Sequence, residues 1–171
     1  MHTYWISTAR LCLDVEVHPG NASAAGYGLE GLWALIDQLP RERWPHLVRG
    51  DCAYSHEACL LGAEARGLGY LFKVRRTNWV REMIKMIERM ETRWQDAGQG
   101  WQGVEAQLQL SGWSRSRRVV VARRRLREAR SPRARRAWAR QSLSLLIYAG
   151  VEVSGCEVVD YEYQVLITNL P

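Results

Sequence analysis

The chain has 171 residues, of which 47% are hydrophobic and five are prolines, so it fits one domain of ordinary size and is not an intrinsically disordered chain. Its formal charge of +6 comes almost entirely from arginine, because Lys73 and Lys85 are the only lysines among the 24 basic residues. An arginine bias is typical of phosphate recognition, and equally of an arginine-rich coding composition.

The cysteines and the apolar segments set further limits. Cys12, Cys52, Cys59 and Cys156 form no CxxC pair, so neither a zinc finger nor a disulfide framework is indicated. No apolar run approaches the roughly 18 residues that a membrane span needs, and residues 1–5 lack the blocks of a secretory signal. The sequence therefore predicts a cytoplasmic protein with no membrane partner.

The first part of the chain alternates between strand and helix patterns. The expected elements are strands over 3–7 and 11–17, a helix over 23–38, a strand over 47–49, a helix over 56–66 and a strand over 70–74. Such alternation indicates parallel strand pairing and an α/β fold.

After residue 76 the pattern changes. A helix is expected over 80–93, followed by a β-rich region with strands over 104–110, 118–122, 144–153 and 162–168. The very basic segment 123–140 is expected to face solvent or a ligand.

Asp51 is the main candidate for chemistry. It follows a short apolar strand and Gly50 and precedes a helix, at the edge where open α/β sheets usually place their sites. A carboxylate there is a candidate metal ligand, and the alternative is an ordinary helix N-cap or turn. Asp14 and Glu16 do not complete a convincing site with it, and Glu57 is expected on a helix surface.

Five sequence blocks carry a resemblance to a known family. They are VHPGN at 17–21, LVRGDCAY at 47–54, GYLFKVR at 69–75, GWSRSRRVVV at 112–121 and YEYQVLIT at 161–168. In this order and spacing they resemble DDE-type insertion-sequence transposases of the insertion sequence 4 superfamily, and are most similar to the insertion sequence 1380 group.

The resemblance implies a fold and a metal site. The fold is a partial RNase H-like core, a mixed sheet with flanking helices, that carries a β-rich insertion. In this family two aspartates and a glutamate hold two magnesium ions, and the middle carboxylate falls on Asp51, which is thus the expected catalytic residue and metal ligand. The first aspartate is expected before Met1 and the glutamate after Pro171, so the chain is interpreted as an internal fragment that is inactive alone.

The resemblance also predicts a division of the chain. Residues 1–76 are expected to form the partial catalytic core with the second aspartate, 77–156 a helical linker and the β-rich insertion, and 157–171 a return strand of the core.

The basic residues are candidates for DNA contacts. The candidates lie near strand ends or in the β-rich region, and they include one tryptophan that suits base stacking. They are Arg49, Lys73, Arg75, Arg76, Trp113, Arg115, Arg117 and Arg118. The alternative is that the tryptophan belongs to the core and the arginines to a solvated face.

The predicted function is DNA transposition, with Mg²⁺-dependent strand cleavage and transfer at transposon ends and a homodimer in the complete enzyme. The alternative is a non-catalytic DNA-binding remnant or regulator derived from a transposase.

Overall fold

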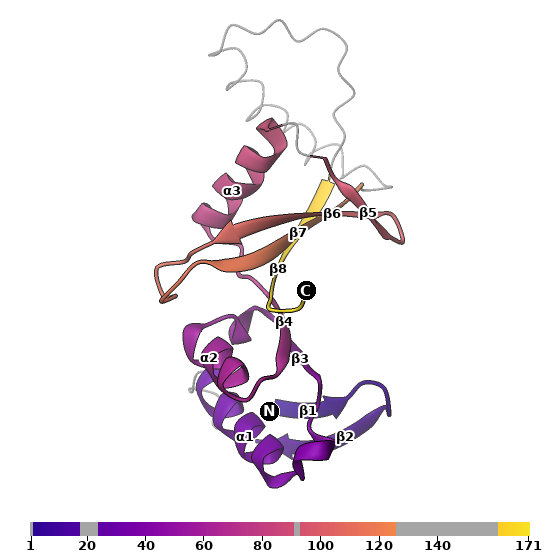
Figure 1. The fold of residues 1–171 in the computed structure, drawn as a ribbon, viewed down its shortest axis with the longest axis vertical. Coiled ribbons are helices and arrows are strands. Elements are labelled where there is room, and N and C mark those ends of the chain that lie inside the picture. The colour runs from indigo at the N-terminus through magenta and orange to yellow at the C-terminus, as the bar shows by residue number, and fades with distance from the viewer. Residues whose placement is uncertain (1, 18–23, 91–92, 126–160) are drawn as a thin grey trace, which may run out of the picture. The chain divides into compact units, whose positions relative to one another are not determined.

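The computed structural model describes residues 2–17, 24–90, 93–125 and 161–171 (Figure 1). By their contacts the residues form two compact units. The first unit comprises residues 1–93, 104–121 and 164–171, and the second comprises 94–103 and 122–163.

Helices and strands follow one another along the chain as the sequence pattern indicates. In chain order they are β1 (His2–Ile6), β2 (Leu11–Glu16), α1 (Ala24–Gln38), the 3-10 turn η1 (Arg41–Arg43), β3 (Leu47–Gly50), the 3-10 turn η2 (Cys52–Tyr54), α2 (Glu57–Ala65), β4 (Gly69–Lys73), α3 (Asn78–Arg89), β5 (Gln95–Gly98), β6 (Trp101–Leu108), β7 (Arg117–Arg125) and β8 (Tyr161–Thr168).

The hairpin of β1 and β2 packs on α1 through Tyr4. The hydroxyl of this buried side chain lies 2.9 Å from the Gly28 carbonyl oxygen and 3.1 Å from Glu16 Oε2, and both are acceptors. Gly31 permits the close approach, since a Cβ there would lie 2.0 Å from Glu16 Oε1. The side of the hairpin that carries Glu16 therefore faces α1.

Strands β3 and β4 are joined through η2 and α2 and run parallel. Leu47 lies opposite Gly69, and Gly50 lies opposite Phe72. Gly69 is required at the start of β4, because a Cβ there would lie 2.8 Å from the His46 carbonyl oxygen. The predicted strand–helix–strand unit is confirmed here.

The larger sheet is mixed, with the strand order β3-β4-β8-β7-β6-β5. Strand β8 runs antiparallel to β4, with Leu71 opposite Thr168 and Lys73 opposite Leu166, so a segment close to Pro171 is paired inside the sheet. Mixed α/β architecture confirms the predicted fold class and is compatible with a partial RNase H-like core.

One expectation about pairing is wrong. Strands β1 and β2 form a separate two-stranded sheet, so parallel pairing applies to β3 and β4 but not to β2 and β3. The connection over residues 7–10 is short, and Arg10 takes the left-handed conformation (φ 52°) that a tight turn uses. Because this turn closes a hairpin, one edge of β2 is already occupied by β1.

The core of the first unit lies around α2 and strands β4, β7 and β8. Its fully buried side chains include Cys59, Leu60, Tyr70, Phe72, Val80, Val119, Val121 and Ile167. The Tyr70 and Phe72 rings stack with their centroids 5.8 Å apart. Burial of each such side chain stabilises the fold by about 1.5–3 kcal/mol, so this region anchors the loops that leave β3 and β4.

The region after β4 is partly described. Helix α3 begins after Thr77, whose Oγ1 accepts a hydrogen bond from the Val80 N–H, and it lies close to the predicted range. Residues 123–125 of the basic segment continue β7, while the rest of that segment and the expected strand over 144–153 lie outside the described residues. Among the described residues, no helix is long and apolar enough to cross a membrane.

Candidate functional site

Asp51 lies directly after β3 and caps the turn η2. Its Oδ1 accepts a hydrogen bond from the Ala53 N–H at 2.9 Å, and the side chain is exposed. Gly50 precedes it because a Cβ there would lie 2.9 Å from the Tyr54 ring, which packs against the end of the strand. Burial raises the pKa of Tyr54, and the Asp51 carboxylate raises it further. Asp51 is thus an ionisable, solvent-accessible carboxylate at the carboxyl end of a strand.

Basic side chains surround this strand edge. Since Gly50 lies opposite Phe72 in the parallel pair, Asp51 and Lys73 occupy equivalent positions at the carboxyl ends of β3 and β4. Arg75 and Arg76 follow Lys73, and all three side chains are exposed. Within the part of the chain that the structure describes, these three make no ion pair, so their charge is available to a ligand.

Arg49 lies on β3 two residues before Asp51 and borders an open pocket. The pocket has a volume of about 590 Å³, and its lining consists of Thr3, Trp5, Ser7, Arg10 and Arg49. Two of these five side chains are cationic, and Trp5 is 60% exposed.

The described residues do not by themselves fit a complete metal centre. A magnesium ion in a phosphoryl-transfer site is held by a few carboxylates together with water and phosphate oxygens. Among residues 2–17, 24–90, 93–125 and 161–171, no group of three or more His, Cys, Asp or Glu side chains is arranged to hold a metal ion. Glu16 accepts a hydrogen bond from Tyr4, and Glu57 is paired with Arg117.

Trp113 is placed in the core of the first unit. It is 5% exposed, and its indole N–H donates a hydrogen bond to the Ser55 carbonyl oxygen at 3.0 Å. Its ring is therefore not presented on the surface, and its polar atom is already satisfied by the turn that follows Asp51.

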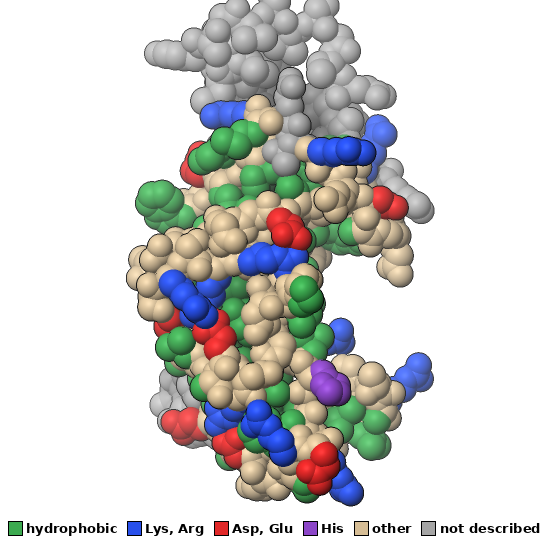
Figure 2. All heavy atoms as spheres, viewed as in Figure 1, with side chains coloured by type: hydrophobic (Ala, Val, Ile, Leu, Met, Phe, Trp, Pro, Cys, Tyr) green, Lys and Arg blue, Asp and Glu red, His purple; other side chains and the backbone are tan. Residues whose placement is uncertain are grey.

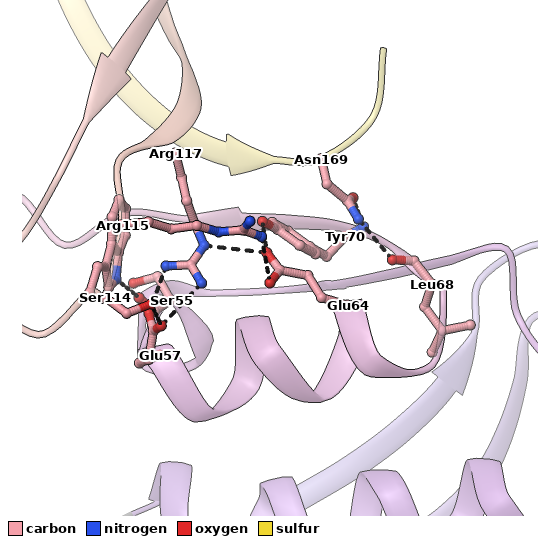
Figure 3. A network of polar contacts seen from close by, with 10 residues as sticks. Ser55, Glu57, Glu64, Leu68, Tyr70, Ser114, Arg115, Arg117 and Asn169 are labelled. Carbon is pink, nitrogen blue, oxygen red and sulfur yellow. Dashed lines mark hydrogen bonds and ion pairs between the residues drawn. The ribbon is translucent and has the colours of Figure 1, made fainter.

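Arg117 lies at the centre of a buried ion-pair network between β7 and α2 (Figure 3). Its Nη1 lies 2.6 Å from Glu57 Oε2, and its Nε lies 3.3 Å from Glu64 Oε1. Hydrogen bonds from Arg117 and Ser114 lower the pKa of Glu57 to about 2. Burial opposes ionisation of Glu64, but hydrogen bonds from basic and tyrosine neighbours outweigh it and lower the pKa of Glu64 as well.

Tyr70 completes this network. Its hydroxyl donates to Glu64 Oε1 at 3.0 Å, and burial together with this bond raises the pKa of Tyr70 to about 12. The network therefore holds two carboxylates ionised and one phenol neutral at physiological pH.

The other two candidate arginines of this region also have partners within the chain. Arg115 pairs with Glu64 at 2.8 Å and is 63% exposed, whereas Arg118 forms two hydrogen bonds with Glu105 and one with the Leu170 carbonyl oxygen. On the face drawn in Figure 2, blue basic side chains likewise lie beside red acidic ones in several places. Arg115, Arg117 and Arg118 are thus each paired with a carboxylate of the chain.

The second unit holds a cation–aromatic cluster that the sequence patterns did not single out. The Arg123 guanidinium lies 4.0 Å from the Trp94 ring centroid and 4.5 Å from that of Tyr161. Arg124 lies 4.8 Å from the centre of Trp101 and pairs with Glu162 at 2.6 Å. The sequence shows the arginines of β7 and the aromatic residues of other segments separately, and which ring meets which arginine depends on strand pairing.

The fold and the candidate site are compatible with a class of protein. A mixed α/β domain with an accessible carboxylate and exposed cations at one strand edge suits a protein that contacts phosphate groups.

Comparison with known families identifies the member of that class. A family model described as a transposase DDE domain matches residues 5–151, and the chain belongs to this family. By family it is an enzyme of DNA transposition, whose members act on DNA and use divalent metal ions. No curated protein and no solved structure matches the chain.

Proposed function

We propose that Asp51 is the second of the three metal-binding carboxylates of this transposase. The observation that carries the proposal is its place after β3, exposed and beside Lys73, with one carboxylate oxygen engaged by the Ala53 N–H. Oδ2 makes no hydrogen bond with any described residue, so it is available to a metal ion. We propose Mg²⁺ as that ion, because it takes carboxylate ligands and keeps positions for water and phosphate oxygens.

We propose that the cations of the strand edge contact the DNA backbone. Arg49, Lys73, Arg75 and Arg76 are exposed, and guanidinium and ammonium groups bind phosphate oxygens without regard to sequence. We propose that their contacts position the scissile phosphodiester near Asp51.

The residues of the β6–β7 region are proposed to act differently from one another. Arg115 keeps the exposure that a phosphate contact requires. Trp113 and Arg117 are buried, and Arg118 is held by Glu105, so we propose that these three stabilise the fold rather than touch DNA.

We propose that the remaining metal ligands come from outside the described residues. One carboxylate cannot hold two magnesium ions, and the described part of the chain offers no group of three ligands. We also propose that the 171-residue chain alone does not catalyse strand transfer. The competing function is a non-catalytic DNA-binding regulator, and the experiment below distinguishes the two.

We further propose that the chain belongs to the insertion sequence 1380 group of the insertion sequence 4 superfamily. Support comes from the five sequence blocks in order, two of which include the ends of β3 and β4. The pairing of β8 with β4 supports a division into a core over 1–76, a linker and insertion over 77–156, and a return strand over 157–171.

Homodimerisation is part of the same proposal. It is supported by large apolar side chains that β1, β2 and the residue after β2 expose: Trp5, Ile6, Leu11, Leu13, Val15 and Val17.

The test combines DNA binding with a strand-transfer assay. The purified chain and its Asp51→Asn variant are incubated with duplex DNA and Mg²⁺. We expect equal binding that weakens with salt, and no strand transfer by either protein. Mg²⁺-dependent strand transfer that Asp51→Asn abolishes would contradict the regulator function and our claim of an incomplete site. Binding that does not change with salt would contradict the phosphate contacts.

A further inference from the structure

We propose that Trp113 and Arg117 are positioning residues for Asp51, and that the loop between β6 and β7 holds the active-site turn in place. The proposal rests on the metal role of Asp51. Figure 3 shows part of the contacts that carry it, those of Glu57 and Glu64 with Ser114, Arg115 and Arg117. Both partners belong to the first unit.

The first contact acts on the turn that Asp51 begins. Asp51 Oδ1 caps this turn at Ala53, and the Ser55 hydroxyl donates back to the Cys52 carbonyl oxygen at 3.1 Å. The Ser55 carbonyl oxygen in turn accepts the Trp113 indole N–H at 3.0 Å, in a place where both residues are buried. The far end of the turn is thus fixed to a residue 58 positions along the chain.

The second contact lies two residues further on. Arg117 bonds both carboxylate oxygens of Glu57, at 2.6 and 3.2 Å, and Ser114 Oγ lies 2.5 Å from Glu57 Oε1. Bidentate pairing fixes orientation as well as distance, and the Arg117 side chain is only 3% exposed. Because Glu57 is the first residue of α2, this contact fixes the helix start relative to the turn.

These contacts matter for Asp51 because its own anchoring is slight. Its side chain makes one hydrogen bond with the described residues and is otherwise exposed. A metal ligand must be held to within about 0.5 Å of its productive position, and supporting residues usually supply that restraint. Trp113 and Arg117 restrain the segment that follows Asp51, and so they help to hold Asp51 in position. The β6–β7 loop is therefore part of the structure that supports the site.

Amide hydrogen exchange in the full chain, with Mn²⁺ as a paramagnetic probe, tests the proposal. Trp113→Phe keeps an aromatic ring in the core, removes the N–H donor and shortens the side chain, and Arg117→Lys keeps the charge and removes the bidentate pair. We expect exchange at the Ala53 and Tyr54 amides to become about fivefold faster, as for the loss of one net hydrogen bond. Exchange at core amides of the first unit should increase by a smaller factor than exchange at these two amides.

The matched control is Arg118→Lys, which alters the neighbouring arginine that pairs with Glu105. It should leave the Ala53 and Tyr54 amides at the wild-type rate. Unchanged exchange at these amides in Trp113→Phe and Arg117→Lys would overturn the positioning role. An increase by the same factor at core amides and at these two amides would also overturn it.

Mn²⁺ separates this role from simple packing and from the proposed function itself. In the wild type, Mn²⁺ should broaden the amide signals next to Asp51, and both variants should weaken this broadening at least about twofold, because a mobile ligand binds less well. If both variants leave the broadening intact, the positioning role is overturned, and the metal role of Asp51 is not. Absence of broadening in the wild type would overturn the metal role of Asp51.

Discussion

Removal of Arg117 should destabilise the first unit strongly. The pKa of Glu57 falls from 4.5 to about 2 in the folded chain, and one pKa unit corresponds to about 1.4 kcal/mol, so the contacts of Glu57 with Arg117 and Ser114 contribute about 3 kcal/mol. An independent estimate agrees, since removing one partner of a buried ion pair costs about 3–5 kcal/mol. We therefore expect Arg117→Ala to lower the free energy of unfolding by about 3 kcal/mol at pH 7.

Urea unfolding followed by circular dichroism measures this loss. Arg118→Ala is the matched control, because Arg118 pairs with the largely exposed Glu105 and such surface pairs contribute about 0–1 kcal/mol. A coupling energy between Glu57 and Arg117 of at least about 1.5 kcal/mol is expected from a double-mutant cycle with Glu57→Gln. If Arg117→Ala costs no more than Arg118→Ala, the reasoning from burial and pairing is refuted.

Three further predictions concern pH, the cap and DNA. Because folding lowers the pKa of Glu57, its charge stabilises the fold fully above pH 4.5, and this stabilisation is lost as the pH falls toward about 2. Glu57→Gln should therefore show a smaller decline in the free energy of unfolding between pH 5 and 2 than the wild type. An equal decline in both proteins would contradict this. Asp51→Ala should cost about 1 kcal/mol in the same urea assay through loss of the Ala53 cap, whereas a cost near zero would show that the cap is not formed in solution. Substitution of both Lys73 and Arg75 by glutamine should reduce the salt slope of DNA binding by about two, and an unchanged slope would show that these side chains do not meet phosphates.

The sequence was a good guide where the fold depends on local patterns. The strand–helix–strand unit that carries Asp51 was predicted from an apolar run, Gly50, Gly67 and Gly69, because each of these acts through its immediate neighbours. The place of Asp51 at the end of β3 follows from that unit. Its metal role was predicted from family resemblance and is still a proposal.

The roles of the β6–β7 residues could not be predicted in the same way. Trp113 and Arg117 appear in a basic, tryptophan-containing block that is typical of nucleic-acid contacts. Their partners Ser55 and Glu57 lie about sixty residues earlier, and nothing local indicates that β7 returns to α2. The sequence shows that a side chain is charged, but only the three-dimensional structure shows whether an opposite charge lies beside it.

The hairpin at the start of the chain shows the same limit. Strand–helix alternation predicts parallel pairing of strands that are joined through a helix, but β2 pairs antiparallel with β1 through a tight turn at Arg10 and not with β3. Pairing between consecutive strands depends on the turn that joins them, and no glycine marks this one.

Binding of a metal ion at Asp51 tests the central claim most directly. The measurement is nuclear magnetic resonance of the full chain titrated with Mn²⁺ in place of Mg²⁺, for the wild type and Asp51→Asn, which keeps an oxygen acceptor for the Ala53 cap and removes the charge. The account predicts selective broadening of the amide signals of residues 50–54 in the wild type and its loss in Asp51→Asn. Broadening that centres elsewhere, or that persists unchanged in Asp51→Asn, would contradict it.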